Sequence, residues 1–92
     1  MIVRHTFQLF ALCPFETGRG NHDFYEVIVE LDREVDVHVL EERIRNFGGG
    51  YYSQETIADM ISKDLRCFSP LKLEVHGKHS ANSKTSVFIN VT

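Results

Sequence analysis

The residues best suited to chemistry flank one polar connector in the first quarter of the chain. Cys13 ends an alternating apolar run, and His22 and Asp23 begin the next one. A cysteine becomes a strong nucleophile when a neighbouring base or positive charge favours its thiolate. This set of residue types predicts either an activated thiol or, in the simpler interpretation, a small buried residue that closes a strand.

A second polar group lies in residues 76–84, which read HGKHSANSK. Ammonium, hydroxyl and amide groups of this kind contact phosphate in nucleic-acid complexes. Arg4 and Arg19 would join the group if they lie at the same end of the sheet, which the sequence leaves open. The predicted binding residues are Arg4, Arg19, Lys78, His79, Asn82 and Lys84. A solvated hairpin turn explains the same composition equally well.

The remaining residues match no metal-binding or cofactor-binding motif. His76 and His79 are three apart on or near a strand, where side chains alternate between faces and diverge. Residues 48–50 are three glycines that lack the strand, lysine and hydroxyl context of a phosphate loop, so they predict a flexible connection between two helices. We expect no metal site and no cofactor.

The elements that must position these groups follow from hydrophobic periodicity. Strict alternation predicts strands, and apolar residues at helical spacing predict helices. The expected strands cover residues 2–12, 25–31, 71–76 and 85–91, and the expected helices cover residues 36–47 and 53–65. Asp36 and Ser53 are the predicted N-caps. Residues 77–84 are expected to form a turn, and Cys67 to lie in the core.

This order predicts a single α+β domain over residues 1–92, with the plan β-β-α-α-β-β. Each strand offers one apolar face and each helix one apolar stripe. A four-stranded, mainly antiparallel sheet with both helices on one face buries them together. Four apolar residues then fall on the other face of the sheet: Phe10, Phe24, Ile28 and Phe88. They indicate either a partner surface or ordinary scattered exposure.

Composition narrows the class of protein. A formal charge of −3 and a pI near 5.9 argue against broad, non-specific nucleic-acid binding. Two cysteines suggest no disulfide framework, which favours a reducing compartment. The sequence contains neither the apolar run of a signal peptide nor the ~20 apolar residues that span a bilayer. We expect a cytoplasmic location, in the host cell if the protein is phage-encoded, and no membrane partner.

Several short motifs together resemble the nitrile reductases of queuosine biosynthesis, which belong to the tunnelling-fold superfamily. The matching pieces run through most of the chain in order: Leu12-Cys13-Pro14, Asp23-Phe24, Arg45-Asn46, Glu55, Asp64-Leu65, Pro70, Glu74-Val75 and Gly77-Lys78. The resemblance implies that Cys13 adds to a substrate nitrile, Asp23 acts as acid and Glu55 holds a purine-like base. It also implies a site assembled between subunits.

Three segments depart from the pattern of that family. The connector between Cys13 and Asp23 is longer, and residues 35–40, VDVHVL, replace a lysine-rich segment that binds the nicotinamide cofactor. Residues 80–82, SAN, replace an arginine-glycine-glycine turn. These departures favour binding over catalysis in the sequence-based interpretation, with no catalytic residue unless Cys13, Asp23 and Glu55 act as the resemblance implies.

The length and acidity of the chain also resemble those of small phage-encoded inhibitors of CRISPR effector complexes. This second resemblance rests on size and character and transfers no residue roles. The main functional prediction is therefore a non-enzymatic inhibitor that docks on a protein or ribonucleoprotein complex, with local phosphate contacts. The alternative is a tunnelling-fold enzyme or deazapurine-binding protein that uses Cys13, Asp23 and Glu55.

Overall fold

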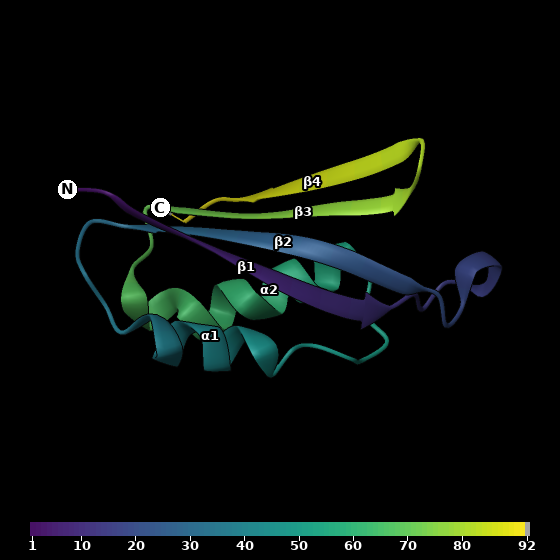
Figure 1. Ribbon diagram of the computed structural model, residues 1–92, viewed down its shortest axis with the longest axis horizontal. Coiled ribbons are helices and arrows are strands. Elements are labelled where there is room, and N and C mark those ends of the chain that lie inside the picture. The colour runs from purple at the N-terminus through teal and green to yellow at the C-terminus, as the bar shows by residue number, and fades with distance from the viewer. Residues whose placement is uncertain (92) are drawn as a thin grey trace.

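A computed structural model describes residues 1–91 and confirms the predicted fold class. Its elements are β1 (Val3–Leu12), β2 (His22–Leu31), α1 (Val37–Arg45), α2 (Gln54–Asp64), β3 (Lys72–Ser80) and β4 (Ser83–Ile89), with 3-10 turns η1 (Glu16–Gly18) and η2 (Leu65–Phe68). The four strands lie in the order β1-β2-β3-β4, and every neighbouring pair is antiparallel. Both helices cover the same face of the sheet (Figure 1).

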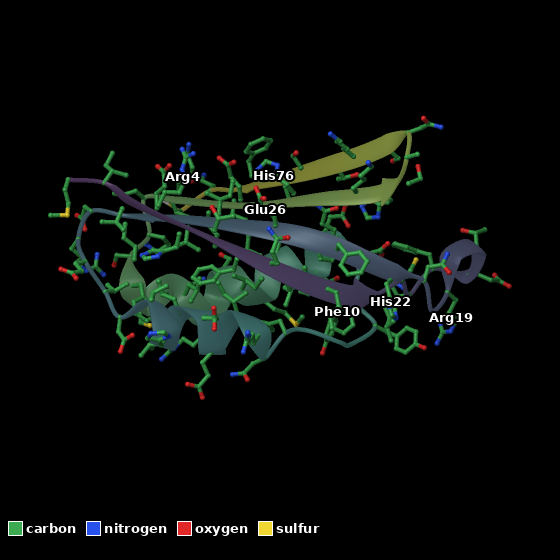
Figure 2. The ribbon with its side chains drawn as sticks, in the orientation of Figure 1. Arg4, Phe10, Arg19, His22, Glu26 and His76 are labelled. Atoms are coloured by element: carbon green, nitrogen blue, oxygen red, sulfur yellow. The ribbon has the colours of Figure 1, made fainter. Side chains whose placement is uncertain are left out.

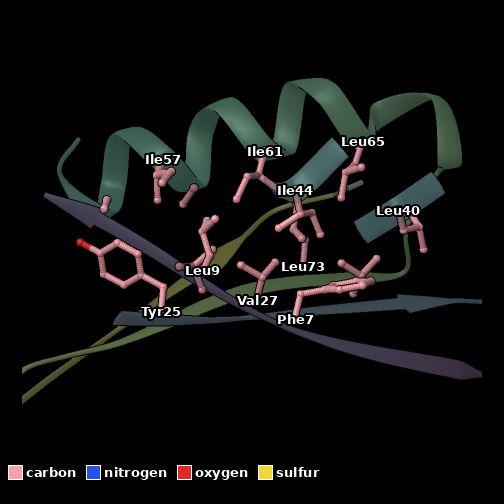
Figure 3. Close-up of a cluster of buried hydrophobic side chains, with 14 of the residues drawn as sticks. Phe7, Leu9, Tyr25, Val27, Leu40, Ile44, Ile57, Ile61, Leu65 and Leu73 are labelled. Carbon is pink, nitrogen blue, oxygen red and sulfur yellow. The ribbon is translucent and has the colours of Figure 1, made fainter. Parts of the chain in front are cut away.

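The core lies between that face and the helices. Odd-numbered strand residues point toward the helices, as the register pairs Phe7 with Val27 and Val27 with Val75. Ile57 and Ile61 of α2 are fully buried against them (Figure 3). Burying a side chain of this size contributes about 1.5–3 kcal/mol relative to leaving it exposed. The alternation seen in the sequence is therefore what joins the two layers.

The helix starts are those predicted. The Asp36 carboxylate accepts a hydrogen bond from the His38 backbone N–H at 2.9 Å, and the Ser53 hydroxyl accepts one from Thr56 N–H at 3.2 Å. The end of α2 differs, because the chain tightens into η2 after Asp64. A 3-10 turn advances 120° per residue rather than 100°, so Cys67 rotates off the apolar stripe. Cys67 is exposed, and the prediction that it lies in the core is wrong.

The hairpin between β3 and β4 is longer than predicted. Residues 77–80 and 83–84 belong to the strands, and only residues 81 and 82 form the turn. Backbone pairing extends to Ser80 and Ser83, with an irregular register between Lys78 and Ser80. Polar side chains are compatible with this pairing because the hairpin end faces solvent. The predicted turn over residues 77–84 is therefore wrong in extent.

The glycine segment, residues 48–50, is hydrogen bonded along the edge of β1. Gly49 N–H donates to the Phe10 carbonyl at 3.0 Å, and Leu12 N–H donates to the Gly50 carbonyl at 2.8 Å. Gly49 has a φ of +81°, a conformation that favours glycine. The segment is thus a fixed connection that directs the start of α2 to the Cys13 end of the sheet.

The sheet face opposite the helices, here called the open face, carries the predicted aromatic residues. Phe10, Phe24 and Phe88 are exposed there. The Phe10 ring centroid lies 5.5 Å from that of His22, and both side chains are labelled in Figure 2. Within residues 1–91 there is no helix of the length and apolarity needed to cross a membrane.

Candidate active site at the Cys13 end of the sheet

Cys13, Asp23 and His79 come from three consecutive strands or their ends and share the helix face. Asp23 pairs with Ala11 across β1 and β2, and Cys13 N–H continues that ladder by donating to the Asn21 carbonyl at 2.8 Å. The register of β2 and β3 pairs Phe24 with Lys78, and just beyond this pair His79 Nδ1 lies 3.6 Å from an Asp23 carboxylate oxygen. Side chains two positions apart on one sheet face are diagonal neighbours. Cys13 and Asp23 therefore occupy diagonal positions at this end of the sheet.

The N-terminus of α2 covers this end of the sheet. Gln54, its first residue, is 2% exposed. The Gln54 side-chain N–H₂ group donates to the Val75 carbonyl at 2.9 Å and to the Thr85 carbonyl at 2.8 Å. The next residue, Glu55, is exposed in the first turn of the helix. Gln54 thus fixes α2 on β3 and β4 and holds Glu55 at the rim.

Tyr25 lies at the centre of this group, at the end of the core cluster (Figure 3). Its hydroxyl donates to the Asp23 carboxylate at 3.4 Å. Burial raises the pKa of the Tyr25 hydroxyl well above its usual value, and Asp23 raises it further through its charge and this hydrogen bond. Negative charge on Cys13 and on Glu55 acts in the same direction. The charges of Cys13, Asp23 and Glu55 therefore all raise the pKa of the Tyr25 hydroxyl.

His79 links α2 to Asp23. Its Nε2 lies 2.8 Å from the Gln54 amide oxygen, and its Nδ1 lies 3.6 Å from an Asp23 carboxylate oxygen. The imidazole also meets the Tyr25 ring edge to face, with centroids 6.2 Å apart. The polar side chains Asp23, Tyr25, Gln54 and His79 form one continuous cluster at the end of the apolar core, here called the polar cluster.

Gly77 allows the polar cluster to pack against β3. A Cβ atom at this position would lie 2.6 Å from Cδ1 of Tyr25 and 2.8 Å from the Gln54 amide oxygen. Carbon atoms in contact normally lie about 3.5–4.0 Å apart. The sequence predicted no functional role for Gln54 or Tyr25, and Gly77 entered only as part of a short motif match. Their positions depend on strand register and on where α2 begins.

Cys13 itself is half-buried beneath the connector. Its sulfur lies 3.1 Å from the place where a Cβ on Gly18 would stand, so η1 folds closely over the thiol. Arg19 donates to the Pro14 carbonyl at 3.2 Å and lies 5.2 Å above the Tyr51 ring, which anchors the connector. Residues 1–91 contain no group of three His, Cys, Asp or Glu side chains placed to hold a metal ion.

The predicted binding residues do not form one surface. Arg4 is at the far end of the sheet from Arg19, as Figure 2 shows, and its Nε donates to the Glu30 carboxylate at 2.7 Å. Lys78 and Lys84 pair across β3 and β4 and share the open face, whereas His79 points to the helix face. Only Lys78, His79, Asn82 and Lys84 belong to one hairpin.

Residues 35–40 differ from the segment that binds a nicotinamide cofactor in the resembling family. Asp36 caps α1, and Leu40 is fully buried in the core. The segment contains no lysine. Its residues build the start of a helix and offer no cationic surface, so they do not fit the role of that lysine-rich segment.

Comparison with solved structures gives an informative likeness. No protein-family model matches the chain, and no curated protein matches it. A solved structure described as "Crystal structure of the archaeosine synthase QueF-Like in the apo form" superimposes with a TM-score of 0.74. The two sequences are 16% identical, and the match covers 96% of this chain and 90% of that chain. At this identity the likeness establishes the shared fold.

The prediction of a non-enzymatic, phage-type inhibitor of a CRISPR effector is wrong. It rested on size and acidity, which many small domains share, and the structural likeness is to a synthase of the fold that the local motifs had suggested. Short matches spread in order along a chain carry information about fold, whereas length and net charge do not. The alternative interpretation as a tunnelling-fold protein is the one that this likeness supports.

Proposed function

We propose that this protein binds a purine-like heterocycle bearing a nitrile and that Cys13 adds to the nitrile carbon. The observation that carries the proposal is the polar cluster beside Cys13, in which Asp23 accepts from the buried Tyr25 hydroxyl while the first turn of α2 holds Glu55 at the rim. The fold shared with an archaeosine synthase and the resemblance of the short motifs to the nitrile reductases of queuosine biosynthesis both support this substrate class. The proposed reaction class is covalent addition to a carbon–nitrogen triple bond.

The proposed addition needs a nucleophile and an acid. The Cys13 sulfur forms a bond to the nitrile carbon, and one π bond of the nitrile breaks. The nitrogen then takes a proton from Asp23, and the proton lost by the thiol restores the acid through solvent. The product is a thioimidate, and no electron is gained or lost overall. Asp23 is placed for the acid role because its side chain is only 10% exposed and lies on the same sheet face as the core.

Glu55 supplies recognition in this proposal. Its carboxylate accepts hydrogen bonds only, so it matches a ring edge that presents neighbouring N–H donors. Guanine-like bases carry such an edge, whereas adenine-like bases do not present the same pair of donors. The proposed preference is therefore for a guanine-like ring. The first turn of α2 holds the carboxylate at the rim, where a ligand can reach it.

The test is mass spectrometry of the intact protein after incubation with a deazaguanine that carries a nitrile. We expect a mass increase equal to the probe, and no increase with the same ring lacking the nitrile. Cys13→Ala should lose the adduct. The matched control is Cys67→Ala, because Cys67 is the other cysteine and is exposed in η2, away from the polar cluster. If the Cys67→Ala protein still forms the adduct, the adduct is on Cys13.

Glu55→Gln tests recognition separately from chemistry. Losing a charged hydrogen bond of this kind costs about 1.5–3 kcal/mol, so the probe concentration for half-maximal labelling should rise about tenfold or more. The maximal adduct yield should remain. If Cys13→Ala labels as well as the parent protein, or if the parent forms no adduct with the nitrile probe, the proposed function is rejected.

A further inference from the structure

The Gln54 side chain has only one possible amide orientation. Its N–H₂ group faces two backbone carbonyls, those of Val75 and Thr85, which can only accept hydrogen bonds. The amide oxygen must therefore face His79. An amide oxygen accepts hydrogen bonds and cannot donate them, so the His79 Nε2 at 2.8 Å must be the donor. Two hydrogen bonds at the other end of Gln54 thus fix a proton on His79 Nε2.

This arrangement leaves Nδ1 as the one ring nitrogen of His79 that can take up another proton. It faces Asp23 at 3.6 Å, which is ion-pair distance. Without a proton between them, the lone pairs of nitrogen and carboxylate oppose each other. A proton on Nδ1 converts this opposition into an imidazolium–carboxylate pair. The second Asp23 oxygen accepts from Tyr25 at 3.4 Å, so Tyr25 fixes the orientation of the carboxylate.

We propose that Gln54 and His79 are positioning residues that keep one exchangeable proton on the pair formed by Asp23 and His79 Nδ1. The use of this proton in adding a nitrile rests on the proposed function, whereas the proton arrangement itself does not. During addition this one proton passes from His79 Nδ1 through Asp23 to the nitrile nitrogen. The thiol proton then returns to the imidazole through solvent, so all protons balance.

The ionisable groups around His79 come from every element that packs there. Asp23 and Tyr25 belong to β2, Cys13 directly follows β1, and Glu55 is the second residue of α2. Among the hydrogen bonds and ion pairs of residues 1–91, the polar cluster has no lysine or arginine partner. A proton on Nδ1 therefore faces the Asp23 carboxylate with no competing cation bound to it.

His76 on the same strand provides an internal comparison. Its Nε2 lies 2.8 Å from a Glu74 carboxylate oxygen, and its Nδ1 lies 2.7 Å from the Ser86 hydroxyl. A hydroxyl can donate or accept, so it does not dictate which nitrogen carries the proton. His76 also faces the open side of the sheet. It therefore has a similar carboxylate partner without a fixed tautomer and without access to Cys13.

The direct test is nuclear magnetic resonance of the free protein with ¹⁵N-labelled histidine at neutral pH. We expect a ring N–H signal from Nε2 of His79 that exchanges with water more slowly than that of His38, because the His79 side chain, although 33% exposed, donates this hydrogen to Gln54. Gln54→Leu should abolish the persistent signal. If this variant does not fold, the spectrum of the parent protein still tests the proposal. A proton on Nδ1 of His79 together with an unprotonated Nε2 would overturn it.

The functional test compares the pH profile of adduct formation at Cys13. His79→Phe should lower the rate about tenfold or more and move the pH of fastest addition by about one unit. His76→Phe should leave both unchanged. Equal profiles for the parent and His79→Phe would overturn the positioning role. Absence of any adduct in the parent would reject the proposed function instead, while the ring N–H signal would continue to test the proton arrangement.

Discussion

Replacing Gly77 by alanine tests the packing that holds the polar cluster. The added Cβ would lie 2.6 and 2.7 Å from two Tyr25 ring carbons and 2.8 Å from the Gln54 amide oxygen. Tyr25 is 1% exposed and Gln54 2%, so neither side chain can swing into solvent. Overpacking of this kind costs about 1–3 kcal/mol. A displaced Gln54 also weakens its hydrogen bond to His79, which adds about 1 kcal/mol.

An opposing effect makes the sign of the result decisive. Alanine in a strand stabilises the folded state by about 0.5–1 kcal/mol relative to glycine, because glycine loses more backbone entropy on folding. The net prediction is that Gly77→Ala lowers the free energy of unfolding by about 2 kcal/mol. Without the close contacts, the same substitution would stabilise the protein. Urea denaturation followed by circular dichroism measures the difference directly.

A double-mutant cycle assigns that cost to the Tyr25 ring. Tyr25→Leu removes the ring carbons nearest to the new Cβ, so Gly77→Ala should cost at least about 1 kcal/mol less in this background. Two results would refute the reasoning. One is a Gly77→Ala variant as stable as the parent or more stable. The other is an equal cost with tyrosine and with leucine at position 25.

Other perturbations test separate parts of the structure. The raised pKa of Tyr25 means that its stabilising effect is complete below about pH 10 and is lost as the pH rises further, so unfolding free energy should fall there, less steeply in Tyr25→Phe. Ser53→Ala removes the α2 cap and should cost about 1 kcal/mol in thermal unfolding. Lys78 and Lys84 oppose each other across two strands, so Lys84→Glu should raise the unfolding free energy by about 0.5 kcal/mol. Light scattering should find an oligomer, because a site of the proposed class is assembled between subunits, and a strict monomer would contradict the proposed function.

The sequence was sufficient for the element order because each element carries its own periodic pattern. The caps at Asp36 and Ser53 were predictable since each side chain bonds to backbone only two or three residues away. Cys67 was misplaced because the change from α-helix to 3-10 turn after Asp64 leaves no mark in the apolar spacing. Local signals therefore predicted local structure, and small changes in helix geometry escaped them.

The candidate site required information that no local pattern contains. Asp23 and His79 are far apart in sequence and meet because β2 and β3 pair in one register. Gln54 follows its capping serine, and its sequence position alone does not reveal that its amide will span β3 and β4. Cys13 was a candidate from residue types alone, whereas Glu55 was one only through the resemblance. Neither line of reasoning could predict Gln54 and Tyr25, which strand register and the start of α2 bring to this site.

The hairpin formed by β3 and β4 illustrates why a basic segment in sequence need not be one surface. Successive strand residues point to opposite faces, so Lys78 and Lys84 face the open side while His79 enters the polar cluster. Phosphate contacts by the two lysines remain a separate proposal about the open face. His79, between the two lysines in sequence, instead takes part in the chemistry proposed for Cys13. Because backbone and core separate the two faces, charge changes at the lysines should alter binding on the open face without disturbing the fixed tautomer of His79.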